Sequence, residues 1–462
     1  MIVMKFGGSS VGDGVRIRNV AKLVKDTKAP RVVVVSAVGG VTDKLINIAN
    51  KVVDVPTLVV EKEVDLFYRE ILIQHREALE DAVSDRKILS ELLPEIISLL
   101  DQLKVALLGV GYLEDLTPKS LDYIMSFGER LSIVLVSGAL RSMGVDAVPL
   151  TGFEAGLITD NNYGCAHPDH KASKAKAVKV ITALSKQGKT PVVTGFVAGN
   201  RNGKITTLGR GGSDYTASLL GNYLSAKEVQ IWTDVDGIMT TDPRIAKDAK
   251  LIDKLSYVEA MDLAYFGAKV IHSKMIEPAM IANIPVWVRN TFKPDCEGTV
   301  ILRDQKKIKQ VIKSVTVKND VALLTVQGVG MAETPNIAGK IFSVLGTNGI
   351  TIPMISGSSE SNLSFIVNKG DLTAAVGLIE EEMVNDGFRG VSVEENTSII
   401  TVVGAGMQGT KGIAAKVFST VSTAGVNIIM IAQGSSEVNI SFVVKDADAK
   451  KAIVALHKKF IE

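Results

Sequence analysis

The stretch IVMKFGGSS, residues 2–10, sets the pattern from which the fold is interpreted. Its first five residues predict a short buried strand that stops at Gly7-Gly8. Residues 31–40, RVVVVSAVGG, repeat the arrangement, with a β-branched run followed by a turn that contains two glycines. A helix is expected between the two strands, over about residues 14–24. The beginning of the chain therefore indicates strands that alternate with helices.

The same alternation continues along the chain. Short apolar runs at residues 191–195, 228–232 and 284–288 follow turn signals and predict strands, and residues 127–143 predict a helix. This order indicates an α/β fold with an open, mostly parallel sheet and helices on both faces. Ligands of such sheets bind beyond the carboxyl ends of the strands, where the glycine-rich stops fall. Residues 59–109 have helical spacing and are expected to form a helical cover, with a break at Pro94.

Composition limits the class of protein. The chain has 462 residues and is 46% apolar, so two to four domains with real cores are expected. Lys and Arg number 52 against 50 Asp and Glu, which gives no strong field for nucleic acid or an anionic membrane. Two cysteines fit a reducing compartment. Neither a signal peptide nor an uninterrupted apolar run of spanning length is found, so we expect a cytoplasmic protein.

Residues 206–217, TTLGRGGSDYTA, are the most distinctive glycine-rich stretch. Glycine lets backbone amides approach a ligand closely, and Ser213 is expected to cap the helix that follows. Arg210 offers a planar fork for a carboxylate or phosphate. On this stretch alone, an anion site and a tight surface turn are equally good interpretations.

Two other stretches are candidates for nucleotide binding. Lys5 stands beside paired glycines, which suits the phosphates of a nucleotide, although an exposed lysine is the simpler interpretation of that residue alone. Residues 228–244, EVQIWTDVDGIMTTDPR, lead from a strand into two aspartates and a glycine. These residues could hold a metal or a ribose, or could form an ordinary turn. The spacing is not that of a calcium loop.

Several patterns are set aside. Gly188-Lys189-Thr190 lacks the first glycine and the following helix of a phosphate-binding loop. Cys165, His167 and His170 lack a second ligand pair for zinc, so a solvated loop is expected and no metal site is predicted. The remaining histidines have no neighbouring pattern that would mark a nucleophile system; they are His75, His272 and His457.

From about residue 311 the chain contains an internal repeat. Residues 315–326 align with 391–402, and the agreement continues through the closing strands at 362–367 and 439–444. Each unit is expected to run strand, helix, strand, strand, helix, strand. The second unit ends on a helix and lacks its last strand, so residues 311–317 are predicted to complete its sheet. The first unit would then be inserted within the second.

The motifs together resemble those of the aspartate kinases, in order and approximate spacing over the whole chain. They are Lys5–Ser10 (KFGGSS), Val35-Ser36-Ala37 with Thr42-Asp43, Phe127–Arg130 (FGER), residues 206–217, Trp232–Arg244 and Phe266–Val270 (FGAKV). The resemblance implies an amino-acid kinase fold followed by two ferredoxin-like α+β ACT units, in the form without a fused dehydrogenase. The expected domains are a kinase domain at 1–302, a linker and strand at 303–317, an inserted first ACT unit at 318–393 and a second at 394–462.

The resemblance implies ATP-dependent phosphorylation of the β-carboxylate of aspartate, with magnesium accompanying the ATP. A carboxylate is already ionised at neutral pH, so no general base is needed and catalysis can be mainly alignment and charge neutralisation. The implied catalytic residues are Lys5, Asp214 and Lys269. Aspartate would be held by Ser36, Thr42, Glu129, Phe196, Thr207, Arg210 and Ser213. ATP would be held by Lys5, Gly7, Gly8, Ser9, Thr233, Asp234, Met239, Arg244 and Lys269, with Met239 in place of an aromatic residue.

The ACT pair is implied to be regulatory, with threonine or lysine as the effector. The second unit keeps Gln433 in the loop AQGSSE, whereas the first reads SGSSE and has lost that side chain, which could remove an effector contact. Candidate effector residues are Met407, Gly412, Ile413, Asn427, Gln433 and Asn439. The alternative is that the ACT units only dimerise the chain. A homodimer formed through the ACT units, or a tetramer, is expected.

Two other functions remain open from the sequence. One is another kinase of the same superfamily, of the acetylglutamate or uridylate type, against which Glu129 and Arg210 indicate a substrate with both an ammonium and a carboxylate. The other is an inactive amino-acid sensor, against which the intact Lys5, Arg210, Asp214 and Lys269 argue.

Overall fold

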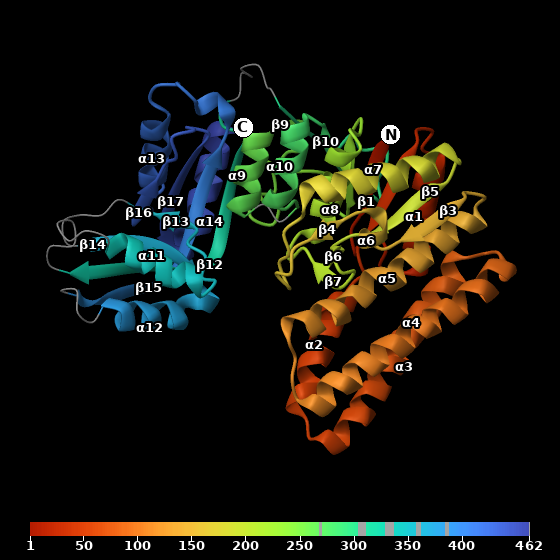
Figure 1. Cartoon of the computed structure of the whole chain (residues 1–462). Coiled ribbons are helices and arrows are strands. Elements are labelled where there is room, and N and C mark those ends of the chain that lie inside the picture. Colours follow the sequence, from red (N-terminus) through yellow and green to blue (C-terminus); the bar gives the residue numbers. More distant parts are fainter. Residues whose placement is uncertain (268–269, 304–310, 329–336, 357–361, 384–387, 462) are drawn as a thin grey trace. The chain divides into compact units, whose positions relative to one another are not determined.

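The computed structural model describes residues 1–267, 270–303, 311–328, 337–356, 362–383 and 388–461. The chain divides into two compact units, each of which is described by itself (Figure 1). The first contains Met1–Ile238, Asp253–Tyr257 and Val270–Arg303, and the second contains Met239–Ile252, Val258–Lys269 and Asp304–Glu462. Two segments before residue 302 therefore belong to the compact unit that contains the C-terminal repeat.

An eight-stranded sheet forms the centre of the first unit, in the order β3-β5-β2-β1-β8-β10-β11-β9. All neighbouring strands are parallel except β10 and β11, which confirms the mostly parallel α/β sheet expected from the sequence. The strands are β1 (Ile2–Phe6), β2 (Arg31–Val35), β3 (Ala147–Leu150), β5 (Thr190–Thr194), β8 (Val229–Thr233), β9 (Lys254–Ser256), β10 (Val286–Asn290) and β11 (Thr299–Leu302). A small separate sheet contains β4 (Ile158–Thr159), β6 (Val197–Asn200) and β7 (Ile205–Thr207).

The central strands are buried on both faces, which explains their continuous apolar sequences. Residues 32–35 are fully buried, and Phe6 stacks on Trp232 of the adjacent strand. One group of helices packs together and contains α1 (Gly14–Asp26), α2 (Val41–Asp54), α3 (Thr57–Ala82), α4 (Arg86–Leu113) and α5 (Pro118–Ser142). The other group contains α7 (His170–Lys186), α8 (Gly212–Tyr223) and α10 (Ser273–Ala282), while α6 (Gly152–Ala155) is a single turn.

Helices α3 and α4 form a long antiparallel pair (Figure 1). The sequence predicted a break at Pro94, but Pro94 lies inside α4. The break lies at residues 83–85, where the Asp85 side chain accepts hydrogen bonds from the Lys87 and Ile88 amides and caps α4. An interior proline costs about 3 kcal/mol. Five buried side chains, each worth about 1.5–3 kcal/mol, outweigh that cost; they are Leu92, Ile96, Leu100, Leu103 and Leu107.

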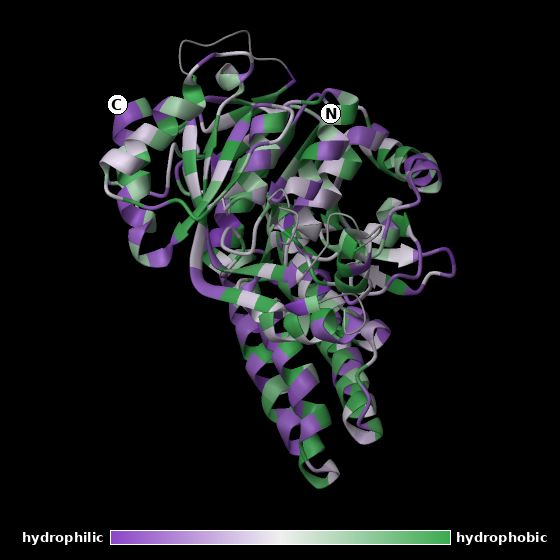
Figure 2. Ribbon diagram, turned by 90° about the vertical axis from the view of Figure 1, so that its left-hand side faces the viewer, coloured by the Kyte–Doolittle hydropathy of each residue, from purple (hydrophilic) through white to green (hydrophobic). Residues whose placement is uncertain are grey.

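By length and composition alone, α4 and α5 could each cross a membrane. However, 89% of the apolar window of α5 is buried inside the protein, and α4 packs along α3 and α5. Figure 2 shows hydrophilic and hydrophobic residues interleaved along the long helical pair, as expected of amphipathic helices. Packing within the first unit therefore accounts for the apolar character of α5, whereas 33% of the apolar window of α4 is buried.

The second unit is built on a six-stranded antiparallel sheet in the order β13-β14-β12-β15-β17-β16. The two long central strands, β12 (Ser314–Gly328) and β15 (Phe388–Val403), each pass through both repeats. Residues 314–318 pair with Ile399–Val403 beside β17, and residues 321–328 pair with the earlier part of β15. The shorter strands are β13 (Met354–Ile355), β14 (Asn362–Asn368), β16 (Met430–Ala432) and β17 (Asn439–Lys445). The domain boundaries at 317 and 393 remain predictions, because both central strands run through them.

Each repeat packs two helices on the sheet and has its own core. The first uses α11 (Ile337–Thr347) and α12 (Leu372–Met383), and the second uses α13 (Ile413–Thr423) and α14 (Asp446–Phe460). Phe365 and Phe442 occupy equivalent strand positions and each makes an edge contact with a helix phenylalanine. Most of α9 (Tyr257–Tyr265) also belongs to this unit.

The exposed position of Pro94 leads to a stability prediction. Pro94→Ala should raise the melting temperature of the full-length protein, because alanine restores an amide donor to the turn that begins at Ser90 and removes a ring clash. Ser90→Ala is the matched control on the same turn and should change stability little. Thermal unfolding of both variants is the measurement, and an unchanged or lower melting temperature for Pro94→Ala would contradict the prediction.

Candidate active site

Four parallel strands of the first unit end at one edge of the sheet. They are β1, β2, β5 and β8, and they end at Phe6, Val35, Thr194 and Thr233. The segments that follow these strands contain Gly7, Ser36, Phe196 and Asp234, all of which the sequence analysis selected. The parallel register thus brings residues that are up to about 230 positions apart to a common edge.

Lys5 lies on β1, which pairs with β2 on one side and with β8 on the other. Its side chain is only 10% exposed, and its Nζ lies 2.5 Å from Oδ1 of Asp214 on α8. A Cβ added to Gly7 would lie 3.5 Å from the same Nζ. The ammonium group therefore has a carboxylate on one side and an open glycine backbone on the other, an arrangement that suits a second anion.

Gly7 and Gly8, which follow β1, lie in different environments. The Gly7 amide donates to the Trp232 carbonyl at 3.1 Å, so this amide is already engaged in the sheet. A Cβ on Gly8 would lie 3.2 Å from the Ala37 carbonyl, because the turns after β1 and β2 pack closely. Ser9 accepts a hydrogen bond at its carbonyl from Arg16. Of the predicted phosphate cradle, only Gly8 and Ser9 therefore keep amides outside the sheet.

The glycine-rich stretch leads into α8. The sequence predicted that Ser213 caps this helix, and that prediction is wrong. Gly211, with a φ of 70°, is the N-cap, and Ser213 lies in the first turn. Glycine is required at 211, because a Cβ there would lie 2.4 Å from the His272 ring. Gly195 is equally constrained, since a Cβ would lie 2.5 Å from the Ser213 hydroxyl oxygen. The end of β5 and the start of α8 are therefore in direct contact.

Several residues that the sequence predicts to bind aspartate lie around this contact. Phe196 adopts a positive φ of 61° and its carbonyl accepts from the Leu208 amide. Arg210 is exposed at the start of the α8 turn. Thr207 is fully buried, and its hydroxyl donates to Asp122 at 2.6 Å. Because that proton is committed, the Thr207 oxygen can only accept further hydrogen bonds.

Glu129 is the most perturbed acidic group at the site. Its side chain comes from α5 and is 3% exposed, and its Oε1 accepts from the Ala37 amide at 3.2 Å. Burial raises the pKa of Glu129 to about 8, opposed by the Ala37 hydrogen bond and by the nearby Lys5 charge. Its buried Oε2 has no hydrogen-bond partner among the described residues. A buried carboxylate oxygen in this position can accept a hydrogen bond from a cationic ligand.

Ser36 directly precedes Ala37, whose amide donates to Glu129, and Thr42 lies near Gly128, the residue before Glu129. The Ser36 amide donates to the Phe6 carbonyl, which joins the segment after β2 to the end of β1. A Cβ on Gly128, the residue before Glu129, would lie 2.8 Å from the Ala37 side chain and 3.8 Å from the Thr42 hydroxyl. Both side chains are half-buried and remain open to a ligand.

The sequence analysis missed Asp122 and set His272 aside. Asp122 is fully buried on α5 and accepts from the Gly164 amide as well as from Thr207, so it fixes the base of the glycine-rich stretch. The signal was the spacing of Asp122, Ser126 and Glu129, which places polar groups on one face of an apolar helix. His272 packs against Gly211; its pKa is lowered by burial and then by Lys274 and Arg210, against the effect of Asp214.

The predicted nucleotide residues divide between the two units. In the first, Thr233 ends β8 and its hydroxyl donates to Asp234 at 3.1 Å. In the second, the Met239 carbonyl accepts from Ser314, and Arg244 is 80% exposed and paired with Asp242 at 2.6 Å. Lys269 lies outside the described residues. The two units are described separately, so these groups are not placed relative to Lys5.

The candidate effector residues have mixed environments in the second unit. Met407 and Ile413 are buried in the core of the second repeat, and Gly412 is the N-cap of α13 with a φ of 83°. Asn439 donates to Asp262 of α9 at 2.8 Å. Asn427 and Gln433 are exposed. The corresponding loops of the first repeat, at residues 329–336 and 357–361, lie outside the described residues.

The residues set aside as a zinc site have separate partners. Cys165 accepts from Lys274 at 3.2 Å, His167 pairs with Asp160, and His170 contacts the Tyr223 hydroxyl. Within the described ranges, no group of three or more His, Cys, Asp or Glu side chains is arranged to hold a metal ion.

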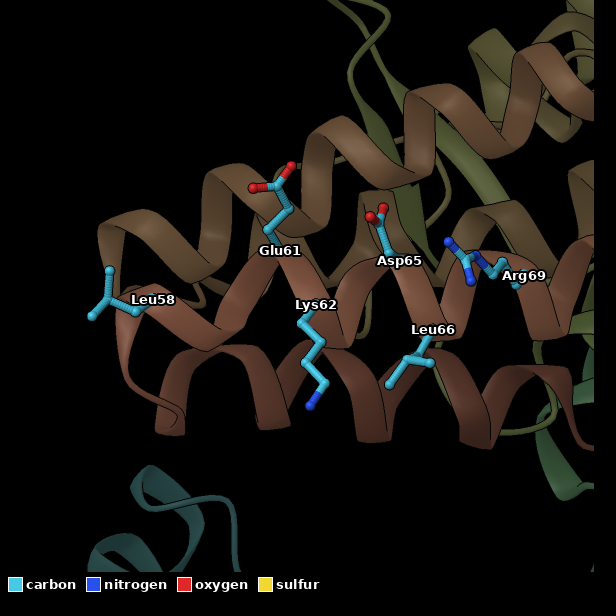
Figure 3. Close-up of a pocket in the computed structure, with 6 residues that line it drawn as sticks. All are labelled: Leu58, Glu61, Lys62, Asp65, Leu66 and Arg69. Atoms are coloured by element: carbon cyan, nitrogen blue, oxygen red, sulfur yellow. The ribbon is translucent and has the colours of Figure 1, made fainter.

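A surface hollow of about 390 Å³ on α3 contains none of the predicted site residues (Figure 3). It is lined by Leu58, Glu61, Lys62, Asp65, Leu66 and Arg69.

Comparison with known families and proteins identifies the family of the chain. The model of the amino acid kinase family matches residues 1–290, and that of the ACT domain matches residues 324–383 and 400–460. Aspartokinase 3, chloroplastic, of Arabidopsis thaliana is 36% identical over 100% of this chain and 81% of its own length. A bifunctional aspartokinase/homoserine dehydrogenase of Haemophilus influenzae is 34% identical over 99% of this chain and 56% of its own length.

Solved structures agree with these relatives. Aspartokinase III of E. coli in complex with aspartate and ADP has a TM-score of 0.86 at 30% identity, covering 100% of both chains. The same enzyme in complex with lysine and aspartate has a TM-score of 0.81. The fold and the site thus define a kinase of the amino acid kinase family with a pair of ACT units. Within this class, the chain belongs to the aspartokinase family.

The raised pKa of Glu129 predicts how substrate binding depends on pH. The kcat/KM for aspartate should rise about tenfold per pH unit below pH 8 and level off above it, because an ammonium ligand requires the ionised carboxylate. Glu129→Gln should give a lower and flatter profile. Steady-state kinetics from pH 6 to 9 are the measurement. A flat profile for the unmodified enzyme would contradict this role of Glu129.

The same shift has a consequence for stability. Because the folded pKa of about 8 exceeds the unfolded value near 4.5, the folded state binds more protons between these values. The contribution of Glu129 to the free energy of unfolding is therefore largest below about pH 4.5 and is lost as the pH rises to about 8.

Proposed function

We propose that this chain transfers the γ-phosphoryl group of ATP to the β-carboxylate of L-aspartate and forms 4-phospho-L-aspartate, the first step towards lysine, threonine and methionine. The observation that carries the proposal is the edge of the first sheet, where Lys5 pairs with Asp214 and its charge acts on the buried Glu129, whose Oε2 has no hydrogen-bond partner among the described residues. A cation for a phosphoryl group and a carboxylate for an ammonium are what a phosphoryl transfer to an amino acid requires.

The chemistry needs few reactive groups. One oxygen of the aspartate β-carboxylate forms a bond to the γ-phosphorus, the bond from that phosphorus to the bridging oxygen breaks, and ADP leaves. No proton has to be removed from the nucleophile. The protein therefore acts by alignment and by neutralising the charge on the transferring group. Lys5 supplies that positive charge, and Asp214 holds its side chain at the edge of the sheet.

Aspartate would lie between α5 and the start of α8. Arg210 pairs with its α-carboxylate, Glu129 accepts from its ammonium group, and Ser36, Thr42 and Ser213 donate hydrogen bonds. Phe196 lines the pocket. Thr207 is fully buried and hydrogen-bonded to Asp122, so its part is to shape the pocket wall.

ATP would be held by Gly8 and Ser9 after β1, by Thr233 and Asp234 after β8, and by Met239, Arg244 and Lys269. Magnesium bound to ATP would neutralise phosphate charge. The described residues offer no cluster of carboxylates to hold the ion, so the phosphates and water are its expected ligands. Among the proposed site residues, Asp214 is the acidic group that faces the cation at Lys5.

The ACT pair would regulate this activity by binding an amino acid. The named lysine complex of the E. coli enzyme supports lysine as an effector, and threonine is the other candidate. Titrating activity with lysine and threonine, alone and together, identifies the effector. ACT pairing between chains would give a homodimer or a tetramer, in the cytoplasm or in a plastid like that of the chloroplastic relatives.

An ATP-dependent hydroxamate assay tests the function as a whole. Aspartate should yield the acyl hydroxamate, because hydroxylamine traps an acyl phosphate. Product with another acid but none with aspartate would select a different kinase of the same superfamily. No turnover of any acid, with amino-acid binding retained, would select a sensor.

Lys5→Ala should lower kcat by about two to three orders of magnitude with little change in the KM for aspartate, since the lost charge acts on the transferring group. Lys22→Ala, an exposed lysine of α1, is the matched control and should have near-normal kinetics. Steady-state kinetics with varied aspartate measure both constants. A near-normal kcat for Lys5→Ala would remove this residue from the reacting centre.

Arg210→Ala should weaken aspartate binding by about 2–4 kcal/mol, because the α-carboxylate would lose its charged partner. The expected result is a large rise in the KM for aspartate with a smaller change in the KM for ATP. Arg201→Ala, at the exposed turn between β6 and β7, controls for loss of an arginine in the same region. An unchanged KM for aspartate would place the α-carboxylate elsewhere.

A further inference from the structure

A short hairpin of the second unit contains two of the residues proposed for nucleotide binding. The Thr240 amide donates to the Lys250 carbonyl at 2.9 Å, and Met239 pairs with Leu251. Met239 and Arg244 lie on the first half of this hairpin. Thr240, between them, is only 5% exposed. An interaction that fixes Thr240 therefore fixes the backbone between Met239 and Arg244.

Thr240 joins three segments through its hydrogen bonds. Its carbonyl accepts from the Val315 amide of β12 at 2.9 Å. Its hydroxyl oxygen accepts from the Lys250 amide at 2.9 Å and lies 2.9 Å from Nε2 of His457. His457 is on α14, the last helix of the chain, and is 1% exposed. The hairpin is thus attached both to the sheet and to the C-terminal helix.

One tautomer of His457 uses the Thr240 hydroxyl as a donor. The Thr240 oxygen already accepts from Lys250, and its hydroxyl proton is donated to Nε2 of His457 when that nitrogen is unprotonated. In that tautomer the imidazole proton is on Nδ1, which faces Oδ2 of Asp248 at 3.3 Å. This contact is not a well-aligned hydrogen bond. The order carboxylate, imidazole, hydroxyl resembles a catalytic triad, but burial of Thr240 and His457 makes it a positioning arrangement.

We propose that His457 is a positioning residue for ATP: acting through Thr240, it holds the hairpin that carries Met239 and Arg244 in the conformation that binds the nucleotide. The inference rests on the proposed role of those two residues. A helix of the second ACT repeat then contributes directly to nucleotide affinity and not only to effector binding. The simpler alternative, a buried histidine that only stabilises the fold, predicts a loss of stability without any selective change in the KM for ATP.

The test compares His457→Leu with His457→Gln in the full-length enzyme. Leucine removes the acceptor and leaves the Thr240 hydroxyl unsatisfied, so the KM for ATP should rise about tenfold while the KM for aspartate stays within about twofold. Glutamine can place an oxygen near the Nε2 position and should recover most of the affinity. Thr240→Val, compared with Thr240→Ser, repeats the test from the other side of the contact.

His75→Leu is the matched control. His75 is also fully buried, and burial lowers its pKa to about 4, but it lies on α3 of the first unit. This variant should lower the melting temperature without changing the KM for ATP. Equal rises of both KM values in His457→Leu, or no rescue by glutamine and serine, would overturn the positioning role.

Arg244→Ala separates failure of this inference from failure of the proposed site. If Arg244→Ala raises the KM for ATP and neither His457→Leu nor Thr240→Val does, the inference is wrong and the nucleotide site stands. If Arg244→Ala has no effect on ATP, the assignment of the hairpin to the nucleotide is itself wrong, and the inference falls with it.

Discussion

The parallel pairing of β1 between β2 and β8 is the constraint on which the candidate active site depends. It places Lys5 on a fully buried central strand of the sheet and brings the segments after Phe6, Val35, Thr194 and Thr233 to one edge. An ammonium group that is only 10% exposed is costly unless it has an anion nearby, and Asp214 of α8 supplies that anion at 2.5 Å. The pair fixes the start of α8 and with it the glycine-rich stretch.

Helix α5 carries the other constraint on this site. It is the most buried long helix of the first unit, yet one of its faces holds Asp122, Ser126 and Glu129. The Asp122 carboxylate is satisfied by Thr207 and Gly164, which makes it structural. The Glu129 carboxylate has one oxygen without a hydrogen-bond partner in the described part of the chain and a raised pKa, which makes it a candidate for ligand binding. Two similar residues on one helix face thus differ in role because their hydrogen-bond partners differ.

In the second unit, individual contacts connect segments that precede residue 268 with the ACT repeats. Glu259 of α9 is fully buried, pairs with Lys313 at 2.9 Å and accepts from the Ala405 amide at 2.7 Å. Thr240 is held by β12 and by His457 of α14. Removing one partner of a buried ion pair leaves an uncompensated charge, which is strongly destabilising. Residues 239–252 and 258–267 are therefore held to the ACT repeats by buried interactions.

The sequence by itself determined the strand and helix order, the mostly parallel sheet, the internal repeat and the residues at the strand ends, because these depend on local periodicity, turn chemistry and glycine. It was wrong about Pro94 and about the cap of α8, where burial of an apolar stripe and the contact of Gly211 with His272 outweighed local preference. Only the tertiary structure decided the roles of Asp122, His272 and His457. Their partners lie 42 to 217 positions away in the chain, and even where spacing places Asp122 on a polar helix face, no local pattern in the sequence identifies so distant a partner.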